Sequence, residues 1–155
     1  MHKVRVVRSV RDAARQGVLM ARKCRCPMEV NMINSAGLWS CQITLRVEFG
    51  ESGARLPEVI RIPFGVPLTS LEDVELALWR AQAAILNYHQ ESTDLFLTKA
   101  RDELEYYRSH ETLKKGTLKF TKNVIVVDIF DPTCANLSFV DLPGKSITCR
   151  RVTFC

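Results

Sequence analysis

The sequence lacks any apolar run near the length that a membrane-spanning helix needs, which is about 20 residues. Its start also lacks an apolar segment followed by a cleavage site, so no secretory signal is predicted. A chain of 155 residues, 46% hydrophobic and 25% charged, is long enough for one ordinary domain or for part of a larger one. We therefore expect a cytoplasmic protein.

The cysteines and histidines are not arranged as a metal site. None of the six cysteines belongs to a C-x-x-C pair, and none of the three histidines stands at a zinc-binding spacing from them. Reduced thiols are therefore expected in a cytosolic compartment.

A complete phosphate-binding loop of the form G-x-x-x-x-G-K-[ST] is also missing. Gly144-Lys145-Ser146 imitates the end of such a loop, but the first glycine would have to stand where the sequence has Phe139. The phenylalanine side chain would fill the hollow in which backbone N–H groups hold a phosphate. We conclude that residues 144–146 do not form a working phosphate loop.

Positive charge is concentrated at the two ends of the chain. Residues 1–25 carry eight Lys and Arg against Asp12, a net +7, and residues 145–155 carry a net +3. Residues 26–144 sum to −5, so the overall +5 is poor evidence for a nucleic-acid surface, and no nucleic acid is expected as a partner. Residues 1–23 form a basic leader, for which a mitochondrial presequence, a basic phosphate-binding arm and no role at all remain open.

Alternating apolar and polar residues predict two strands after this leader. Residues 27–33 and 39–49 both alternate, and the polar turn between them contains Gly37, so we expect an antiparallel hairpin. Residues 57–67 are expected to be extended and loop-like because three prolines interrupt them.

Two helices are predicted next. Thr69-Ser70-Leu71-Glu72 is a capping box, and apolar residues then recur at every third or fourth position up to Asn87. The second helix, over residues 93–107, is more charged. Its expected inward side chains are Phe96, Leu97, Ala100, Leu104 and Tyr107.

Two further strands complete the pattern. Residues 123–130 (NVIVVDIF) are strongly apolar, and residues 137–140 are expected to form a short buried strand that pairs with them as an antiparallel hairpin. Asp141 ends the second strand, and the carboxyl edge of an α/β sheet is where ligands bind. Gly144 would let the backbone approach such a ligand closely.

The run from Asn136 to Gly144 (NLSFVDLPG), together with the preceding strand and the loop containing Pro132, resembles part of the GTPase domain of the dynamin superfamily. The family's corresponding segment reads very like N-L-T-L-V-D-L-P-G. Residues 25–30 (RCPMEV) resemble the segment after the family's first switch, in the fungal dynamin-like style. Residues 76–87, which contain the run RAQAAILN, resemble the helix between the two motifs.

This resemblance covers about residues 24–144 and implies a fold. We expect an α/β protein with an incomplete three-layer sheet of the P-loop GTPase type, containing antiparallel hairpins and two helices. Residues 24–144 would be a partial GTPase domain, and residues 145–155 a divergent tail.

The same resemblance implies a nucleotide site at Asp141, Leu142, Pro143 and Gly144. Asp141 would support Mg²⁺ through a water molecule, and the backbone N–H of Gly144 would face the γ-phosphate of GTP. Leu142 and Pro143 would shape the turn, and no catalytic residue is assigned. Cys24 stands where the family has a switch threonine, and it offers no comparable hydroxyl ligand.

The departures from the family bear on activity. The upstream phosphate-binding loop and the guanine-reading T-K-x-D motif are both missing, and phosphoryl transfer depends mostly on positioning and electrostatics. We therefore expect that this chain alone neither binds GTP and Mg²⁺ tightly nor hydrolyses GTP. Without the strand that leads into the phosphate loop, residues 137–140 would have an unpaired edge and the fold would be marginally stable.

The resemblance also suggests partners. Membranes and microtubules are partners of the family, whereas this chain would associate with itself or with a full-length dynamin-like protein. Two alternatives remain open. One is a non-catalytic interaction protein that retains part of the GTPase fold, and the other is an unrelated α+β binding domain whose D-L-P-G run is coincidental.

Overall fold

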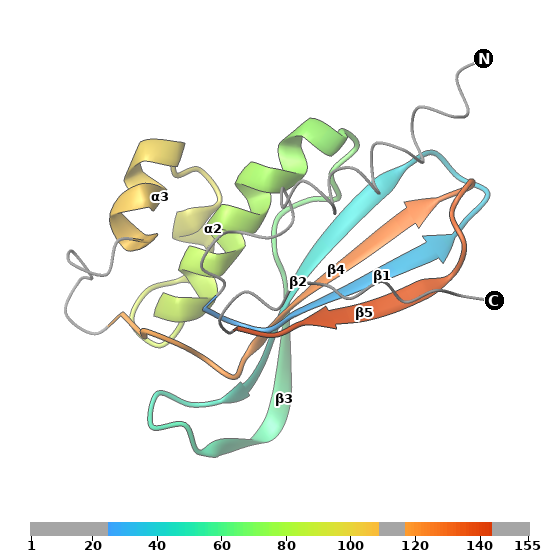
Figure 1. The fold of residues 1–155 in the computed structure, drawn as a ribbon. Helices are drawn as coiled ribbons and strands as arrows, with labels where there is room; N and C mark the ends of the chain where they lie inside the picture. The colour runs from blue at the N-terminus through green and yellow to red at the C-terminus, as the bar shows by residue number, and fades with distance from the viewer. Residues whose placement is uncertain (1–24, 109–116, 144–155) are drawn as a thin grey trace.

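Five strands form one mixed sheet in the computed structural model, which describes residues 25–108 and 117–143 (Figure 1). The order of the strands across the sheet is β3-β2-β4-β1-β5. β1 and β4 pair in parallel, and the other neighbouring strands pair antiparallel. The strands are β1 (Met28–Asn34), β2 (Ser40–Phe49), β3 (Arg55–Pro63), β4 (Val124–Asp131) and β5 (Leu137–Asp141).

The predicted hairpin of residues 27–33 and 39–49 is wrong. Both strands are present, but β4 lies between them, and Val127 of β4 is opposite Val30 on one side and Ile43 on the other. β4 is apolar on both faces over residues 124–127, all of which are buried. A continuous apolar run is typical of a strand in the interior of a sheet, and β4 takes this central place between the two half-buried strands.

The predicted hairpin of residues 123–130 and 137–140 is wrong for a related reason. β1 lies between β4 and β5, so the loop between β4 and β5 has to pass over the end of β1. β5 is also not buried. It is an edge strand, and the side chains of Leu137 and Val140 are 50% and 57% exposed.

β3 is a strand where a loop was expected. Within the described ranges it pairs only with β2, and a proline that lacks an N–H can be accommodated in an edge strand. Pro57 and Pro63 therefore mark an edge and do not exclude a strand. The β2–β3 pairing is irregular between Val47 and Phe49.

The first predicted helix is confirmed, with a different cap. A short turn of 3₁₀ helix, η1 (Leu71–Asp73), leads into α2 (Val74–Asn87). The Oγ atom of Ser70 accepts a 3.4 Å hydrogen bond from the N–H of Glu72, so Ser70 caps η1 in place of Thr69. The buried residues of α2 include the predicted Val74, Leu78, Ala81 and Ile85.

The second predicted helix is broken in two. η2 (Thr93–Phe96) is followed by α3 (Arg101–Arg108). Residues 97–100 separate the two. The N–H of Ala100 donates a 2.8 Å hydrogen bond to Oε2 of Glu103, which caps the start of α3. Phe96 and Leu104 are fully buried as predicted, whereas Ala100 is exposed. The side chain of Tyr107 lies outside the described residues.

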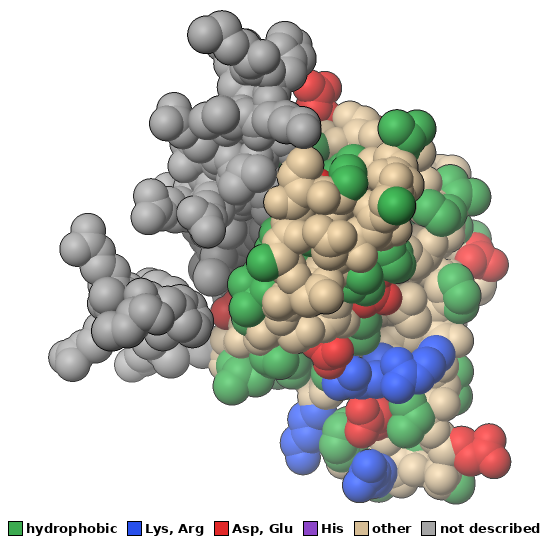
Figure 2. Space-filling model, turned by 90° about the vertical axis from the view of Figure 1, so that its right-hand side faces the viewer, with side chains coloured by type: hydrophobic (Ala, Val, Ile, Leu, Met, Phe, Trp, Pro, Cys, Tyr) green, Lys and Arg blue, Asp and Glu red, His purple; other side chains and the backbone are tan. Residues whose placement is uncertain are grey.

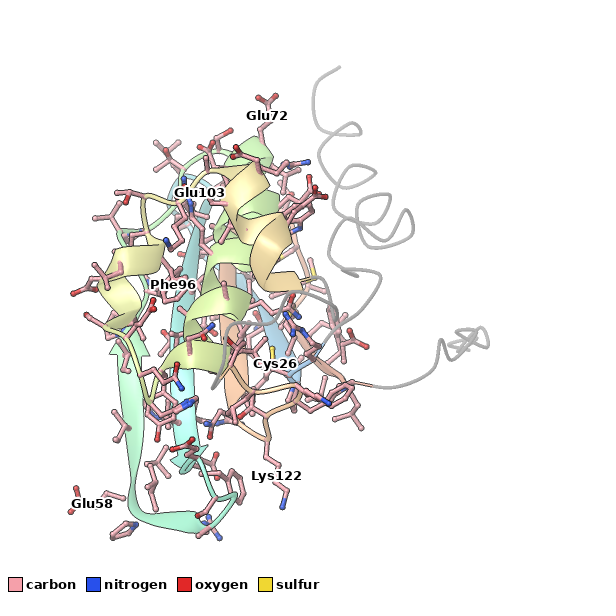
Figure 3. The ribbon with its side chains drawn as sticks, turned by 90° about the vertical axis from the view of Figure 1, so that its left-hand side faces the viewer. Cys26, Glu58, Glu72, Phe96, Glu103 and Lys122 are labelled. Atoms are coloured by element: carbon pink, nitrogen blue, oxygen red, sulfur yellow. The ribbon has the colours of Figure 1, made fainter. Side chains whose placement is uncertain are left out.

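The helices cover one face of the sheet. α2 packs against β2 and β4, and α3 and η2 pack against α2 (Figure 1). Figure 3 looks onto this helical side, with Phe96 among the helices and Cys26 just before β1. The α/β class is therefore confirmed, and the described ranges form two layers, without the predicted third. None of the helices in those ranges is long and apolar enough to cross a membrane.

Candidate functional site

Asp141 lies at the carboxyl end of β5, on the face of the sheet that the helices cover. It is directly opposite Met28 in the β1–β5 ladder, and Met28 belongs to the hydrophobic core. Since β5 is antiparallel to β1, Asp141 lies beside the start of β1. The parallel strands β1 and β4 end at the opposite edge of the sheet. The prediction that Asp141 lies at the carboxyl edge of the sheet is therefore wrong for these two strands.

The Asp141 carboxyl group is half-buried and has no side-chain hydrogen bond or ion pair within the described ranges. Its burial removes water from the carboxylate and raises the pKa of Asp141 above the usual value. A half-buried carboxylate without a partner is free to accept a hydrogen bond or to approach a cation. This is the only chemistry that the geometry gives to this residue.

The other residues of the predicted site are less informative. Leu142 is 68% exposed and Pro143 is half-buried, so the chain leaves β5 along the surface. Gly144 and Cys24 lie outside the described residues, as do the basic leader and the tail from 145 to 155. The structure thus places Asp141, Leu142 and Pro143 together but does not test their relation to Gly144 or Cys24.

The loop over the end of β1 positions β5. Nδ2 of Asn34 donates a 2.8 Å hydrogen bond to the carbonyl oxygen of Cys134, and the N–H of Asn34 donates a 2.7 Å hydrogen bond to Oδ1 of Asn136. Oδ1 of Asp131 accepts two 2.7 Å hydrogen bonds, from the N–H and the hydroxyl group of Thr133. These contacts fix the crossing from β4 to β5. Sequence reasoning missed them, although Asn and Asp at strand ends are typical of such turns.

The face of the sheet opposite the helices carries a polar network beside β5. The carboxylate of Glu29 accepts a 2.8 Å hydrogen bond from Nη1 of Arg46, and Nδ2 of Asn31 donates a 2.8 Å hydrogen bond to Oδ1 of Asp128. The Arg46 hydrogen bond holds the pKa of Glu29 below its usual value. These charges are already paired, so they are a solvated face and do not complete a site with Asp141.

The described residues do not fit a magnesium site by themselves. Mg²⁺ takes six oxygen ligands in octahedral geometry. Within the described ranges there is no group of three or more His, Cys, Asp or Glu side chains that could hold a metal ion. Asp141 would supply one ligand at most, and that through water.

Comparison with known proteins gave no family assignment. A scan against protein-family models found no match, and neither curated proteins nor solved structures contained a match to the chain.

Proposed function

We propose that this chain is part of a dynamin-like GTPase domain and is inactive as a GTPase on its own. The run from Asn136 to Gly144 supports this proposal, because its strand is an edge strand that ends at Asp141. In the described ranges β5 pairs only with β1, so its other side is open to one more strand. A complete domain of this family would need such a strand beside β5, leading into the phosphate-binding loop.

The proposed role of Asp141 comes from the family resemblance, and two features of its surroundings are compatible with it. Its carboxylate has no competing ion pair in the described ranges, and it stands directly before an exposed turn. In a complete domain it would hold the Mg²⁺ of GTP through water, and Leu142, Pro143 and Gly144 would form the turn beside the γ-phosphate. Within the described ranges Asp141 belongs to no group of three or more His, Cys, Asp or Glu side chains that could hold a metal ion. We therefore propose that neither GTP nor Mg²⁺ is bound tightly.

The test is a nucleotide titration of the purified 155-residue chain. A fluorescent GTP analogue is added with millimolar Mg²⁺, and phosphate release is followed in the same buffer. We expect no saturable binding and no turnover above the buffer rate, and Asp141→Asn to give the same result as the native chain. Turnover that the Asp141→Asn variant loses would contradict the proposed inactivity. A transcript that encodes G-x-x-x-x-G-K-S in frame upstream would support the GTPase relationship itself.

The second candidate function is a non-catalytic interaction protein in the cytoplasm. The observation in its favour is the exposed apolar surface of β5 and the residue that follows Asp141, since Leu137, Val140 and Leu142 are each at least half exposed. Its partner would be a second copy or a full-length dynamin-like protein. Co-purification of a stoichiometric partner that Val140→Lys releases would favour this candidate.

A further inference from the structure

The two edges of the sheet differ in how they are protected against another strand. β3 carries Pro57 and Pro63 together with the charged Glu58 and Arg61, all of which hinder pairing. β5 has no proline, lysine or arginine, and its only charge is Asp141 at the end. The backbone groups of β5 that point away from β1 therefore form an open hydrogen-bonding edge within the described ranges.

Both faces of β5 also carry apolar side chains that remain uncovered. Leu137 and Phe139 lie on the helical side, but α2 packs over β2 and β4, so they are 50% and 36% exposed. Val140 is 57% exposed on the other face. A strand that paired with β5 would bury apolar surface on both faces.

The charges of the chain indicate what kind of strand this edge would accept. The described residues carry ten Lys and Arg against fifteen Asp and Glu, a net −5, whereas residues 1–24 carry seven Lys and Arg against Asp12, a net +6. Neither β1 nor β5 contains a Lys or Arg. In Figure 2 the basic side chains gather low in the view, at the height of β3 in Figure 1. A basic segment would therefore meet no like charge from β1 or β5.

We propose that residues 3–7 of this chain (KVRVV) pair with the open edge of β5 as a sixth strand. The segment alternates, so Val4 and Val6 would share one face and cover Phe139 and Leu137 on the helical side. Lys3 and Arg5 would lie on the opposite, polar face. The segment has five residues, as β5 does.

The length of the intervening chain allows this pairing. β1 starts at Met28, directly opposite Asp141 at the end of β5. Residues 8–24 can span roughly 55 Å when extended, which is much more than the length of a five-residue strand, about 17 Å. The segment can therefore reach the edge of β5 within one molecule. The inference does not depend on the GTPase relationship.

Hydrogen exchange of the full-length chain, read by mass spectrometry, tests the pairing. We expect the amides of residues 3–7 and the outward amides of β5 to exchange at least about tenfold more slowly than in an unfolded chain. Val4→Asp with Val6→Asp should remove this protection from both segments and leave α2 and β2 unchanged. The matched control, Val10→Asp with Val18→Asp, should leave the protection intact.

A second variant keeps the test decisive if the first one aggregates. Lys3→Glu with Arg5→Glu keeps the valines and reverses the charge, and it should weaken protection of both segments by several-fold. The proposal is overturned if residues 3–7 of the native chain exchange at unfolded rates. It is equally overturned if their protection appears only in a dimer, as judged by light scattering, because the occupant would then be a second copy.

Discussion

Asn123 shows how one polar side chain can organise the sheet at the scale of a residue. Its Oδ1 accepts 2.9 Å hydrogen bonds from the N–H groups of Glu48 and Phe49, and its Nδ2 donates a 3.0 Å hydrogen bond to the carbonyl of Phe49. Asn123 is buried, so no water can replace these bonds. It closes the end of β2 where the pairing with β3 becomes irregular.

Asn123→Ala should therefore lower the free energy of unfolding by about 2–4 kcal/mol, because it leaves buried backbone groups without partners. The measurement is equilibrium unfolding in urea. Asn136→Ala is the matched control, since Asn136 is exposed and accepts one hydrogen bond from the N–H of Asn34. Its effect should be about 1 kcal/mol or less. Equal losses for the two variants would contradict the proposed role of Asn123.

The pair of Glu29 and Arg46 should contribute a stabilisation that is lost toward acid pH. The hydrogen bond from Arg46 lowers its pKa in the folded state below the usual 4.5. The pair therefore stabilises the fold above the unfolded pKa, and this contribution is lost as the pH falls through the folded pKa. Glu29→Gln should lower the free energy of unfolding at pH 7 by less than about 1 kcal/mol, because the pair is partly exposed. The difference should shrink as the pH falls through the folded pKa of Glu29.

The ionisation of Asp141 should change the free energy of unfolding in the opposite direction. Burial raises its folded pKa above the usual 3.8, so ionisation destabilises the folded state at neutral pH. Asp141→Asn should therefore be more stable than the native chain at pH 7, and the gap should close as the pH falls below 3.8. Urea unfolding of the native chain, Glu29→Gln and Asp141→Asn at pH 3 and pH 7 measures how each stability difference changes with pH. An Asp141→Asn variant that is less stable at pH 7 would indicate a partner for this carboxylate.

At the scale of the element, the central strand β4 should contribute more to stability than the edge strand β5. Val127 is fully buried in the central strand, between Val30 and Ile43, whereas Val140 is mostly exposed at the edge. Val127→Ala should lower the free energy of unfolding by about 2–3 kcal/mol, and Val140→Ala should change it by less than about 0.5 kcal/mol. Urea midpoints of the two variants provide the comparison. Similar losses would mean that β5 is covered as well as β4 is.

The same elements explain which parts of the fold the sequence could predict. Alternation located β1 and β2, and the helical period located α2, because both patterns are local. Which strands pair with each other is not decided by a local pattern. The apolar run of β4 did contain the missing signal, since such a run is typical of a strand in the interior of a sheet, with neighbours on both sides. β1 and β2 are the two strands that supply these neighbours.

The strand that ends at Asp141 was predicted, but its place in the sheet was not. The sequence correctly placed Asp141 at the end of a strand. The sequence did not indicate that β1 separates β5 from β4. The strand at residues 137–140 was therefore predicted to be buried, whereas β5 lies at the edge of the sheet. The contacts of Asn34 with the loop around Cys134 depend on that arrangement, and no local pattern could predict them.

At the scale of the whole molecule, Cys41 should report global unfolding. It is fully buried in β2, and burial raises the pKa of its thiol to about 12. At pH 8 only about one thiol in 10⁴ would be ionised in the folded state. Alkylation of Cys41, followed by mass spectrometry, should therefore require unfolding, and its rate should rise with urea as steeply as the global unfolding constant does. Labelling that does not depend on urea would indicate local opening of β2.

The parallel pairing of β1 with β4 has a consequence for synthesis on the ribosome. Asn31 and Asp128, which share a hydrogen bond in this pairing, are 97 residues apart in the chain. At the usual rate of about 5–20 residues per second, β1 leaves the ribosome roughly 5–20 s before its partner exists. During that interval its apolar side chains have no sheet to join. A nascent chain of this protein should therefore need a chaperone most at the stage when β1 and β2 are complete and β4 has not yet emerged.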